Sequence, residues 1–584
     1  MNNSNKTIEI ISHSFAHVLA VAVLEIHPEA QFGIGPAIEN GFYYDFDKVK
    51  ITLEDLKKIE KKMREIIKKD LKFEKKELAI SEAKKIFKNQ PYKLELVNDI
   101  KKEQKKLQVI SYKLQDFTDL CKGPHINSTK ELNPDAFKLT KVAGAYWRGD
   151  EKNPMLTRIY GVAFENKEEL DKHLEMVAEA EKRDHRKLGK ELDLFSFSDL
   201  VGPGLPLFSP KGTIIIDELQ KHIESVCRRY GFEKVMTPHL AKIDLYELSG
   251  HAQKFGDELF HVRSHHKQNY VLKPVQCPHQ TQIYASHPRS YRDLPIRYME
   301  SNKQYRDEKP GEISGLSRVI AITVEDGHSF CRVDQVKEEI KNMVNIIQDF
   351  YKSLGMWDNH WVSLSVRDYD HPEKYIGDVK DWDTCENMLQ EISDEMKLDA
   401  KKMEGEAALY GPKLDFMFKD SLGKEIQIPT VQVDFATPKR FDLVYTDEKG
   451  NSINPVMVHR AILGSYERFL TLLIEYFAGA FPAWLAPEQV HILTISEKQK
   501  EFANEILNKL KESDIRAVLK DDDDTLGKKI RNSQNEKVPY MLIIGDKEKD
   551  AKMVSARHRK DGDLGQMKIE EFIDKISKEI KNKI

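Results

Sequence analysis

The spacing of apolar residues near the N-terminus predicts a long helix. From residue 8 to residue 24, apolar side chains fall at positions 11, 15, 18, 19 and 22, which is the period of one helical face. His13 and His17 lie four residues apart on a different face. Both imidazoles can therefore point into one cleft.

Two charged segments show the same period. Residues 53–86 are rich in Lys and Glu and predict a solvated helix that packs on one side. Residues 170–192 predict a connecting helix, followed by a loop that contains Gly202-Pro-Gly-Leu-Pro. We therefore expect a domain boundary near residue 190. The apolar positions of the first segment are Leu56, Ile59, Met63, Ile66 and Ile67.

Alternation of apolar and polar residues predicts antiparallel strands in residues 260–330 and 404–436. Between Lys424 and Phe435 the alternation changes phase around Pro429, as a bulge or bend in a strand would cause. The pattern indicates a curved sheet with a polar face.

Beyond Pro482 and Pro487, strand and helix patterns alternate regularly and predict a small α/β domain. The acidic run Asp521 to Asp524 is typical of a solvated turn. The expected elements are strand 490–495, helix 498–511, strand 515–519, helix 526–534 and strand 540–544.

Size and composition place these elements in a multidomain soluble protein. The chain has 584 residues, which suggests about three or four domains. Hydrophobic residues make up 40% and charged residues 32%, and we find no apolar run near the roughly 20 residues that span a bilayer. The start, Met1-Asn-Asn-Ser-Asn-Lys, lacks the order of a secretory signal. We expect a cytoplasmic protein with no membrane partner.

Charge and cysteine content narrow the chemistry. The net charge of −4 is not that of a polycation, so any nucleic-acid surface must be a local basic face. The 5 cysteines are odd in number and scattered. This argues against a disulfide framework and favours reduced thiols or metal ligands.

Histidines and cysteines form two sets. In the first, His13 and His17 with Cys121 and His125 could bind zinc, or could be surface histidines beside a packed thiol. The second set is Cys277, His328 and His459, whose spacing carries no metal signal of its own. Three protein ligands with one open position are what a catalytic zinc site requires.

Arginines accompany the second set. Arginines in this context are typical of enzymes that activate a carboxylate with ATP. That reaction develops charge on the α-phosphate and releases pyrophosphate, and guanidinium groups bind both of these anionic groups well. Arg306, Arg318 and Arg468 are the candidates. The sequence contains no Gly-x-x-x-x-Gly-Lys-Ser/Thr loop, so side chains and metal would have to hold the phosphates.

Several motifs together resemble the threonyl-tRNA synthetases of class II. They are Ser290-Tyr-Arg-Asp-Leu-Pro-Ile-Arg, Gln304-Tyr-Arg-Asp-Glu, Leu409-Tyr-Gly-Pro-Lys and Pro455-Val-Met-Val-His-Arg-Ala-Ile-Leu-Gly-Ser-Tyr-Glu-Arg-Phe. At the front, His13-x-x-x-His17, Gly41-Phe-Tyr-Tyr-Asp and Asp119-Leu-Cys-Lys-Gly-Pro-His125 are similar to that family's editing domain. At the end, Gly527-Lys-Lys-Ile-Arg and Gly545-Asp-Lys-Glu are similar to its anticodon-binding domain.

The resemblance implies a multidomain α+β fold and a homodimeric threonine–tRNA ligase. We expect an α+β editing domain with its connecting helix at 1–190, an antiparallel-sheet class II catalytic domain at 191–484 and an α/β anticodon-binding domain at 485–584. By the same resemblance, we expect the small ubiquitin-like domain that commonly precedes the editing domain to be missing, either natively or by truncation. The implied partners are tRNA(Thr), ATP and threonine, with Mg²⁺ accompanying ATP.

The resemblance also implies residue roles in the catalytic domain. Arg306 would hold the α-phosphate, Glu308 the adenine, and Arg318 and Arg468 the pyrophosphate end. Asp326 would take the threonine hydroxyl. His251 would stand near the terminal ribose, and Pro238 would mark the dimer-forming motif. One zinc ion per subunit would be bound by Cys277, His328 and His459, and the pocket would be lined by Tyr410, Lys413, Gln427, Thr430 and Gln432.

For the other two domains, the resemblance implies hydrolysis of mischarged seryl-tRNA without a required metal. This replaces the zinc hypothesis for the first set. Glu548 and Arg557 match positions associated with the anticodon. The editing centre would comprise His13, His17, Tyr44, Lys93, Asp119, Cys121 and His125.

The sequence departs from the family pattern at several places. The usual Cys-Pro-Gly-His is Cys277-Pro-His-Gln280, and the usual Gln-Asp-Asp-Ala-His is Val324-Glu-Asp-Gly-His328. Ile320 and Ala321 replace an arginine and a glycine, and the run Asp521 to Asp524 replaces a basic stretch.

Three other functions stay open. Val324 and His279 suggest a ligase for another β-hydroxy amino acid. A non-catalytic tRNA-binding paralogue would keep the scaffold alone. The N-terminal centre could also act alone, as a deacylase of charged tRNA.

Overall fold

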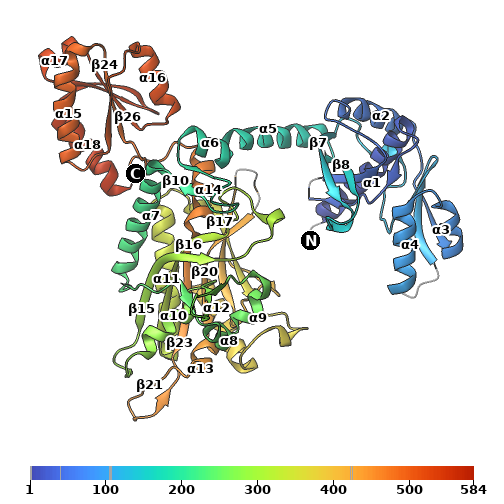
Figure 1. The fold of residues 1–584 in the computed structure, drawn as a ribbon, viewed down its shortest axis with the longest axis horizontal. Coiled ribbons are helices and arrows are strands. Elements are labelled where there is room, and N and C mark those ends of the chain that lie inside the picture. Colours follow the sequence, from blue (N-terminus) through green and yellow to red (C-terminus); the bar gives the residue numbers. More distant parts are fainter. Residues whose placement is uncertain (1–2, 40, 104–107, 421–422, 424, 584) are drawn as a thin grey trace. The chain divides into compact units, whose positions relative to one another are not determined.

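The computed structural model describes residues 3–39, 41–103, 108–420, 423 and 425–583. The chain divides into two compact units, Met1–Ala178 and Glu179–Ile584, coloured from blue to red along the sequence in Figure 1. The predicted multidomain α+β class is confirmed. The predicted boundaries near 190 and 484 stay predictions.

In the first unit a long helix, α1 (Asn3–Ile26), packs on a sheet of order β1-β3-β8-β7, with β2 paired to β3. The apolar residues of α1 are buried against Phe42, Phe46 and Ile159, which confirms the predicted helix. The strands are β1 (Gln31–Phe32), β2 (Ala37–Ile38), β3 (Gly41–Asp47), β7 (Phe137–Tyr146) and β8 (Met155–Ala163).

Within the described part of the chain, one segment, Thr7–Ile26 of α1, is long and apolar enough to cross a membrane, with a mean hydropathy of 1.6. This corrects the prediction that no apolar run approaches such a length. The segment is 61% buried inside the unit, and Ser12, Ser14 and His17 are among its buried residues. It is the core helix of this unit.

The segment 53–86 is only partly helical. Helix α2 (Leu56–Lys68) buries the five predicted apolar residues and confirms that part of the prediction. The continuation is wrong, because β4 (Glu74–Ala79) interrupts it before α3 (Ile80–Ile86). Only Leu78 of β4 is buried. Because the strand has no second buried position, its sequence lacks the alternation of apolar and polar residues that identifies a strand. Its sheet, of order β4-β5-β6, includes β5 (Gln108–Leu114) and β6 (Phe117–Leu120) and packs with α3 and α4 (Pro91–Glu103).

The connecting helix is present as two helices, α5 (Lys167–Arg183) and α6 (His185–Glu191). Asp184 separates them, because its side chain accepts a hydrogen bond from the backbone N–H of Arg186 and caps α6. The loop predicted after it is confirmed and connects β9 (Phe195–Ser196) to β10 (Leu207–Phe208).

The second unit is built on a sheet of order β11-β15-β16-β23-β20-β19-β17-β18 (Figure 1). Strand β11 runs parallel to β15 and β18 runs parallel to β17, while the pairs between them are antiparallel. The strands are β11 (Glu233–Lys234), β15 (Ile296–Tyr305), β16 (Ala321–Cys331), β17 (His360–Val366), β18 (Lys401–Glu404), β19 (Lys413–Lys419), β20 (Glu425–Asp434) and β23 (Val456–Ser465).

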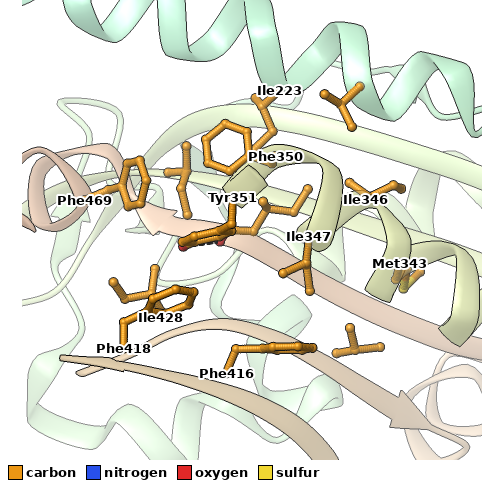
Figure 2. Packing of buried hydrophobic residues seen from close by; sticks show 14 of the residues in the cluster. Ile223, Met343, Ile346, Ile347, Phe350, Tyr351, Phe416, Phe418, Ile428 and Phe469 are labelled. Carbon is orange, nitrogen blue, oxygen red and sulfur yellow. Dashed lines mark hydrogen bonds between the residues drawn. The ribbon is translucent and has the colours of Figure 1, made fainter. Parts of the chain in front are cut away.

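Helices cover this sheet and bury its largest core. Figure 2 shows Phe350 and Tyr351 of α11 packed among residues of α7, α14, β19 and β20, and Tyr351 stacks on Phe418 at 4.4 Å between ring centroids. The helices are α7 (Pro210–Arg229), α8 (Ile243–Ser249), α9 (His251–Phe255), α10 (Cys277–Ala285), α11 (Val336–Lys352), α12 (Val379–Glu395), α13 (Ala436–Arg440) and α14 (Tyr466–Phe477). Shorter strands are β12 (Leu240–Ala241), β13 (His261–Arg263), β14 (Asn269–Leu272), β21 (Tyr445–Thr446) and β22 (Ser452–Ile453).

The predicted antiparallel strands of this unit are confirmed apart from α10. That segment is helical, and Pro278 fits its first turn, where a missing N–H costs nothing. The predicted bulge is also confirmed. Asp415 pairs with Thr430 but Met417 pairs with Gln427, which places one extra residue in β20 around Pro429.

The predicted C-terminal α/β alternation is confirmed, with a sheet of order β25-β24-β26-β27-β28. The run Asp521 to Asp524 is a turn in which Asp521 pairs with Lys500 and Asp524 with Lys528. The elements are β24 (Val490–Thr494), α15 (Lys500–Glu512), β25 (Ala517–Lys520), α16 (Leu526–Asn535), β26 (Tyr540–Ile544), α17 (Asp546–Ala551), β27 (Val554–His558), β28 (Gly562–Met567) and α18 (Ile569–Asn582).

Candidate functional sites

Strand pairing brings the second His/Cys set together. His328 on β16 lies directly opposite His459 on β23, and Cys277 begins α10. All three side chains are buried, and one ligand atom from each lies within 4.8 Å of the others. The large sequence separations therefore conceal a compact group.

The donor set suits zinc. Burial lowers the pKa of His328, which keeps its imidazole neutral. Burial also raises the pKa of the Cys277 thiol, so a thiolate there requires a nearby cation. Two imidazoles and one thiolate, with a fourth position open, are the ligands of a catalytic zinc site.

Both histidines are held by a second residue. His328 Nδ1 lies 2.7 Å from Gln280 Oε1, and His459 Nε2 lies 2.9 Å from Asp434 Oδ2. Sequence reasoning did not identify Gln280 or Asp434 as site residues, because only the fold brings them to the imidazoles.

Asp326 and His251 lie beside this group. Asp326 lies on β16, where it pairs with Ala461 of β23, and it accepts a hydrogen bond of 3.1 Å from Gln304 Nε2. Loss of hydration in the pocket raises the pKa of Asp326 to about 6. His251 Nε2 is 3.9 Å from Cys277 Sγ, and burial lowers the pKa of His251 to about 4.

A polar network on β19 and β20 joins the predicted pocket residues. Asp415 accepts a hydrogen bond of 2.7 Å from Gln427 and pairs with Lys413 at 2.8 Å. Gln432 accepts a hydrogen bond of 2.6 Å from Tyr410 and donates one of 3.3 Å to Thr430. Sequence reasoning missed Asp415, the buried carboxylate that organises half of this network.

The predicted arginines differ in their surroundings. Arg306 follows β15, and its guanidinium lies 5.0 Å from the centroid of the Phe255 ring. Burial lowers the pKa of Arg306, and its Nε has no hydrogen-bond partner among the described residues. Arg318 instead donates a hydrogen bond of 2.7 Å to Glu308. Arg468 lies in the first turn of α14 and is exposed.

The first His/Cys set also converges, in the first unit. Cys121 Sγ lies 3.2 Å from His13 Nε2 and 3.3 Å from His125 Nε2. His17 Nε2 is 3.3 Å from Asp119 Oδ2. One ligand atom from each of His13, His17, Cys121 and His125 lies within 4.8 Å of the others.

Asp119 joins the remaining predicted residues to this cluster. Its carboxylate accepts a hydrogen bond of 2.6 Å from Tyr44 and pairs closely with Lys93. Lys93 also donates a hydrogen bond of 3.2 Å to the Tyr44 hydroxyl. The two buried groups Asp119 and Lys93 thus neutralise each other beside the histidines.

Burial sets the protonation of the N-terminal cluster. It raises the pKa of the Cys121 thiol to about 12 and lowers the pKa values of His13, His17 and His125. At neutral pH the cluster therefore holds a thiol and neutral imidazoles, and a neutral imidazole can accept a proton.

The C-terminal residues predicted for tRNA lie on neighbouring elements. Glu548 on α17 is nearly buried and accepts hydrogen bonds from Ser555 at 2.9 Å and Gln566 at 2.6 Å. Arg557 lies on β27, opposite Met541 of β26. Pro238, predicted at the dimer interface, is exposed just after the edge strand β11.

Known protein families match three parts of the chain. Residues 260–477 match the tRNA synthetase class II core domain for G, H, P, S and T, and residues 489–579 match an anticodon-binding domain. Residues 109–160 match the second additional domain of threonyl and alanyl tRNA synthetases.

Relatives match over nearly the full length. The chain is 45% identical to a threonine–tRNA ligase of Bacteroides fragilis, covering 98% of this chain and 88% of that protein. It is 46% identical to one of Gloeobacter violaceus, covering 96% and 91%. A solved RNA-binding domain of threonyl-tRNA synthetase from Cryptosporidium parvum has a TM-score of 0.64 at 33% identity, covering 68% of this chain and 98% of that one. The chain therefore belongs to the threonine–tRNA ligase family of class II aminoacyl-tRNA synthetases.

Proposed function

We propose that the residues gathered on the central sheet carry out threonine–tRNA ligation. We also propose three domains, with residues 1–190 for editing, 191–484 for catalysis and 485–584 for anticodon binding. The ligase activity follows from family membership. The observation that carries the assignment of residues is Arg306, a half-buried cation whose Nε lacks a partner in the described chain. An anionic substrate group would supply that partner.

In the first step the threonine carboxylate attacks the α-phosphate of ATP and pyrophosphate leaves. Arg306 holds the α-phosphate, Glu308 the adenine, and Arg318 and Arg468 the pyrophosphate end. Mg²⁺ accompanies ATP and shares its charge. The pair that Arg318 makes with Glu308 would have to open or be shared when ATP binds.

Cys277, His328 and His459 would hold one zinc ion per subunit, and zinc with an open position supplies a Lewis acid for the amino acid. Asp326 accepts a hydrogen bond from the threonine hydroxyl. The pocket is completed by Tyr410, Lys413, Gln427, Thr430 and Gln432. Valine offers no hydroxyl to Asp326, so it would lose this hydrogen bond and be rejected.

In the second step a hydroxyl of the terminal ribose of tRNA(Thr) attacks the adenylate carbonyl, the bond to the phosphate breaks and AMP leaves, and His251 lies near that ribose. The C-terminal domain reads the anticodon. Arg557 is available for this contact, whereas the hydrogen bonds of Glu548 within the domain support a role in holding β27 and β28.

Serine keeps the hydroxyl and lacks one methyl group, a difference of about 1 to 3 kcal/mol. The N-terminal cluster would therefore hydrolyse seryl-tRNA, with His13, His17, Tyr44, Lys93, Asp119, Cys121 and His125 as its residues and without a required metal. We also propose a homodimer, formed near Pro238, in the cytoplasm.

Amino-acid-dependent exchange of pyrophosphate into ATP tests the assignment. Threonine should support exchange much better than serine, and valine should support none. Faster exchange with a bulkier β-hydroxy amino acid would instead establish the other ligase. No exchange with any amino acid, on protein that contains zinc, would contradict the catalytic role of these residues.

A further inference from the structure

Gln280 is fully buried against a proposed zinc ligand. It lies on α10, three residues after Cys277, so both side chains project from one side of the helix. Its Oε1 is 2.7 Å from Nδ1 of His328. The family's usual motif has histidine at this position.

The hydrogen bond decides which nitrogen of His328 carries the proton. An amide oxygen only accepts hydrogen bonds, so Nδ1 of His328 must be the N–H. Nε2 then keeps its lone pair, and a metal ligand needs that lone pair. His459 is fixed in the opposite sense, because its Nε2 faces Asp434 Oδ2 at 2.9 Å and leaves Nδ1 free.

Packing alone does not account for a glutamine here. Within the described chain, Gln280 Nε2 is buried and has no hydrogen-bond partner. Leaving such a group unpaired destabilises the folded state, and an apolar side chain of similar size would avoid that loss. The cost is understandable where the oxygen of the same amide is needed.

We propose that Gln280 is a positioning residue that holds His328 in the tautomer and ring orientation required to bind zinc through Nε2. The proposal rests on the zinc site described under the proposed function. It assigns to Gln280 the task that Asp434 performs for His459, so that each imidazole is fixed by an acceptor behind it.

The test compares zinc affinity in three variants of the full-length protein, by competition with a chromogenic chelator. Gln280→Leu removes the acceptor, Gln280→Glu keeps it, and Gln282→Leu makes the same change at an exposed position of the same helix. We expect Gln280→Leu to bind zinc about 10–100-fold more weakly than wild type. Gln280→Glu should bind at least as tightly as wild type, and Gln282→Leu should not differ from it.

Two further readouts separate positioning from stability. The zinc-free Gln280→Leu protein should melt no lower than wild type, because a buried unpartnered amide is gone. Its Co²⁺ form should show a shifted visible spectrum, since the ligand field depends on the imidazole orientation.

Equal zinc affinity of Gln280→Leu and wild type would overturn the proposal. So would a Gln280→Glu variant as weak as Gln280→Leu, which would assign the residue to packing. If the wild-type protein itself takes up no zinc, the zinc site of the proposed function fails as well, and the wild-type measurement distinguishes that case.

Discussion

At the scale of single residues, unpaired buried polar atoms collect around the central site. Arg306 Nε, Gln276 Oε1 and Gln280 Nε2 have no hydrogen-bond partner in the described chain. Each such atom costs about 1–3 kcal/mol, so a folded protein keeps few of them without a functional reason. Gln276 and Arg306 are the two ends of segment 276–306, which contains Cys277 and strand β15. Substrate binding would repay part of that cost.

Replacing Arg306 should separate activity from stability. We expect Arg306→Gln to lower pyrophosphate exchange by about 10²–10³-fold, the loss typical of one preorganised donor to a developing charge. Its melting temperature should equal or exceed that of wild type, since a poorly solvated cation is removed. Arg263→Gln, at an exposed position on β13, serves as the control and should change neither quantity. A melting temperature that falls along with activity would make Arg306 a structural residue.

The pH dependence of hydrolysis belongs to the same scale. Burial holds the pKa values of His13, His17 and His125 below the ordinary value of about 6.5. A lowered pKa means that the neutral, proton-accepting form persists to lower pH. Hydrolysis of preformed seryl-tRNA should therefore stay constant between about pH 6 and 8 and fall only in more acid solution. Single-turnover rates, corrected for spontaneous hydrolysis, measure this. A half-maximal rate near pH 6.5 would contradict it.

At the scale of elements, the sheet creates sites that the sequence does not reveal. Helix α1 and the C-terminal alternation could be predicted because their periodicity is local. The pairing of His328 with His459 could not, because it depends on strands β16 and β23 that are far apart in sequence. The resemblance of the motifs identified that pair of histidines. Gln280, Asp415 and Asp434 could not be predicted as site residues, because only tertiary contacts place them at the site.

Errors in predicted elements have local physical causes. Strand β4 was predicted as helix because four of its six residues are charged and only one is buried, so pairing with β5 alone defines it. Helix α10 was predicted as part of a strand region because its nine residues carry no helical apolar stripe. Both elements are fixed by their neighbours rather than by their own sequence.

A buried ion pair ties two central strands together. Arg460 of β23 crosses Gly327 of β16, and its NH1 donates hydrogen bonds of 2.8 and 2.7 Å to the two carboxylate oxygens of Glu325. Removing one partner leaves the other charge buried alone. Glu325→Ala should therefore lower the free energy of unfolding by about 3–5 kcal/mol, measured in urea. The double variant Glu325→Leu with Arg460→Met should lose less, and an equal or larger loss would contradict this account.

At the scale of the whole molecule, the sites proposed for synthesis and for proofreading lie in different compact units. Cys277, His328 and His459 lie in Glu179–Ile584, and the proposed editing residues lie in Met1–Ala178. The two centres also differ in chemistry. The central set offers three ligands to the proposed zinc ion, whereas Asp119 in the first unit pairs with Lys93. Each activity should therefore be removable without the other.

Reciprocal variants of the full-length chain test this independence. Cys277→Ser, or removal of zinc with a chelator, should abolish pyrophosphate exchange, because the amino acid loses its binding site, while hydrolysis of preformed seryl-tRNA keeps its wild-type rate. His17→Ala should do the opposite and reduce hydrolysis by about 10²–10⁴-fold, the contribution typical of one acid–base group. Exchange would then be unchanged, and seryl-tRNA would accumulate during aminoacylation with serine. Loss of hydrolysis on chelation, restored by added zinc, would instead mean that His13, His17, Cys121 and His125 hold a metal, since their ligand atoms are close enough to share one.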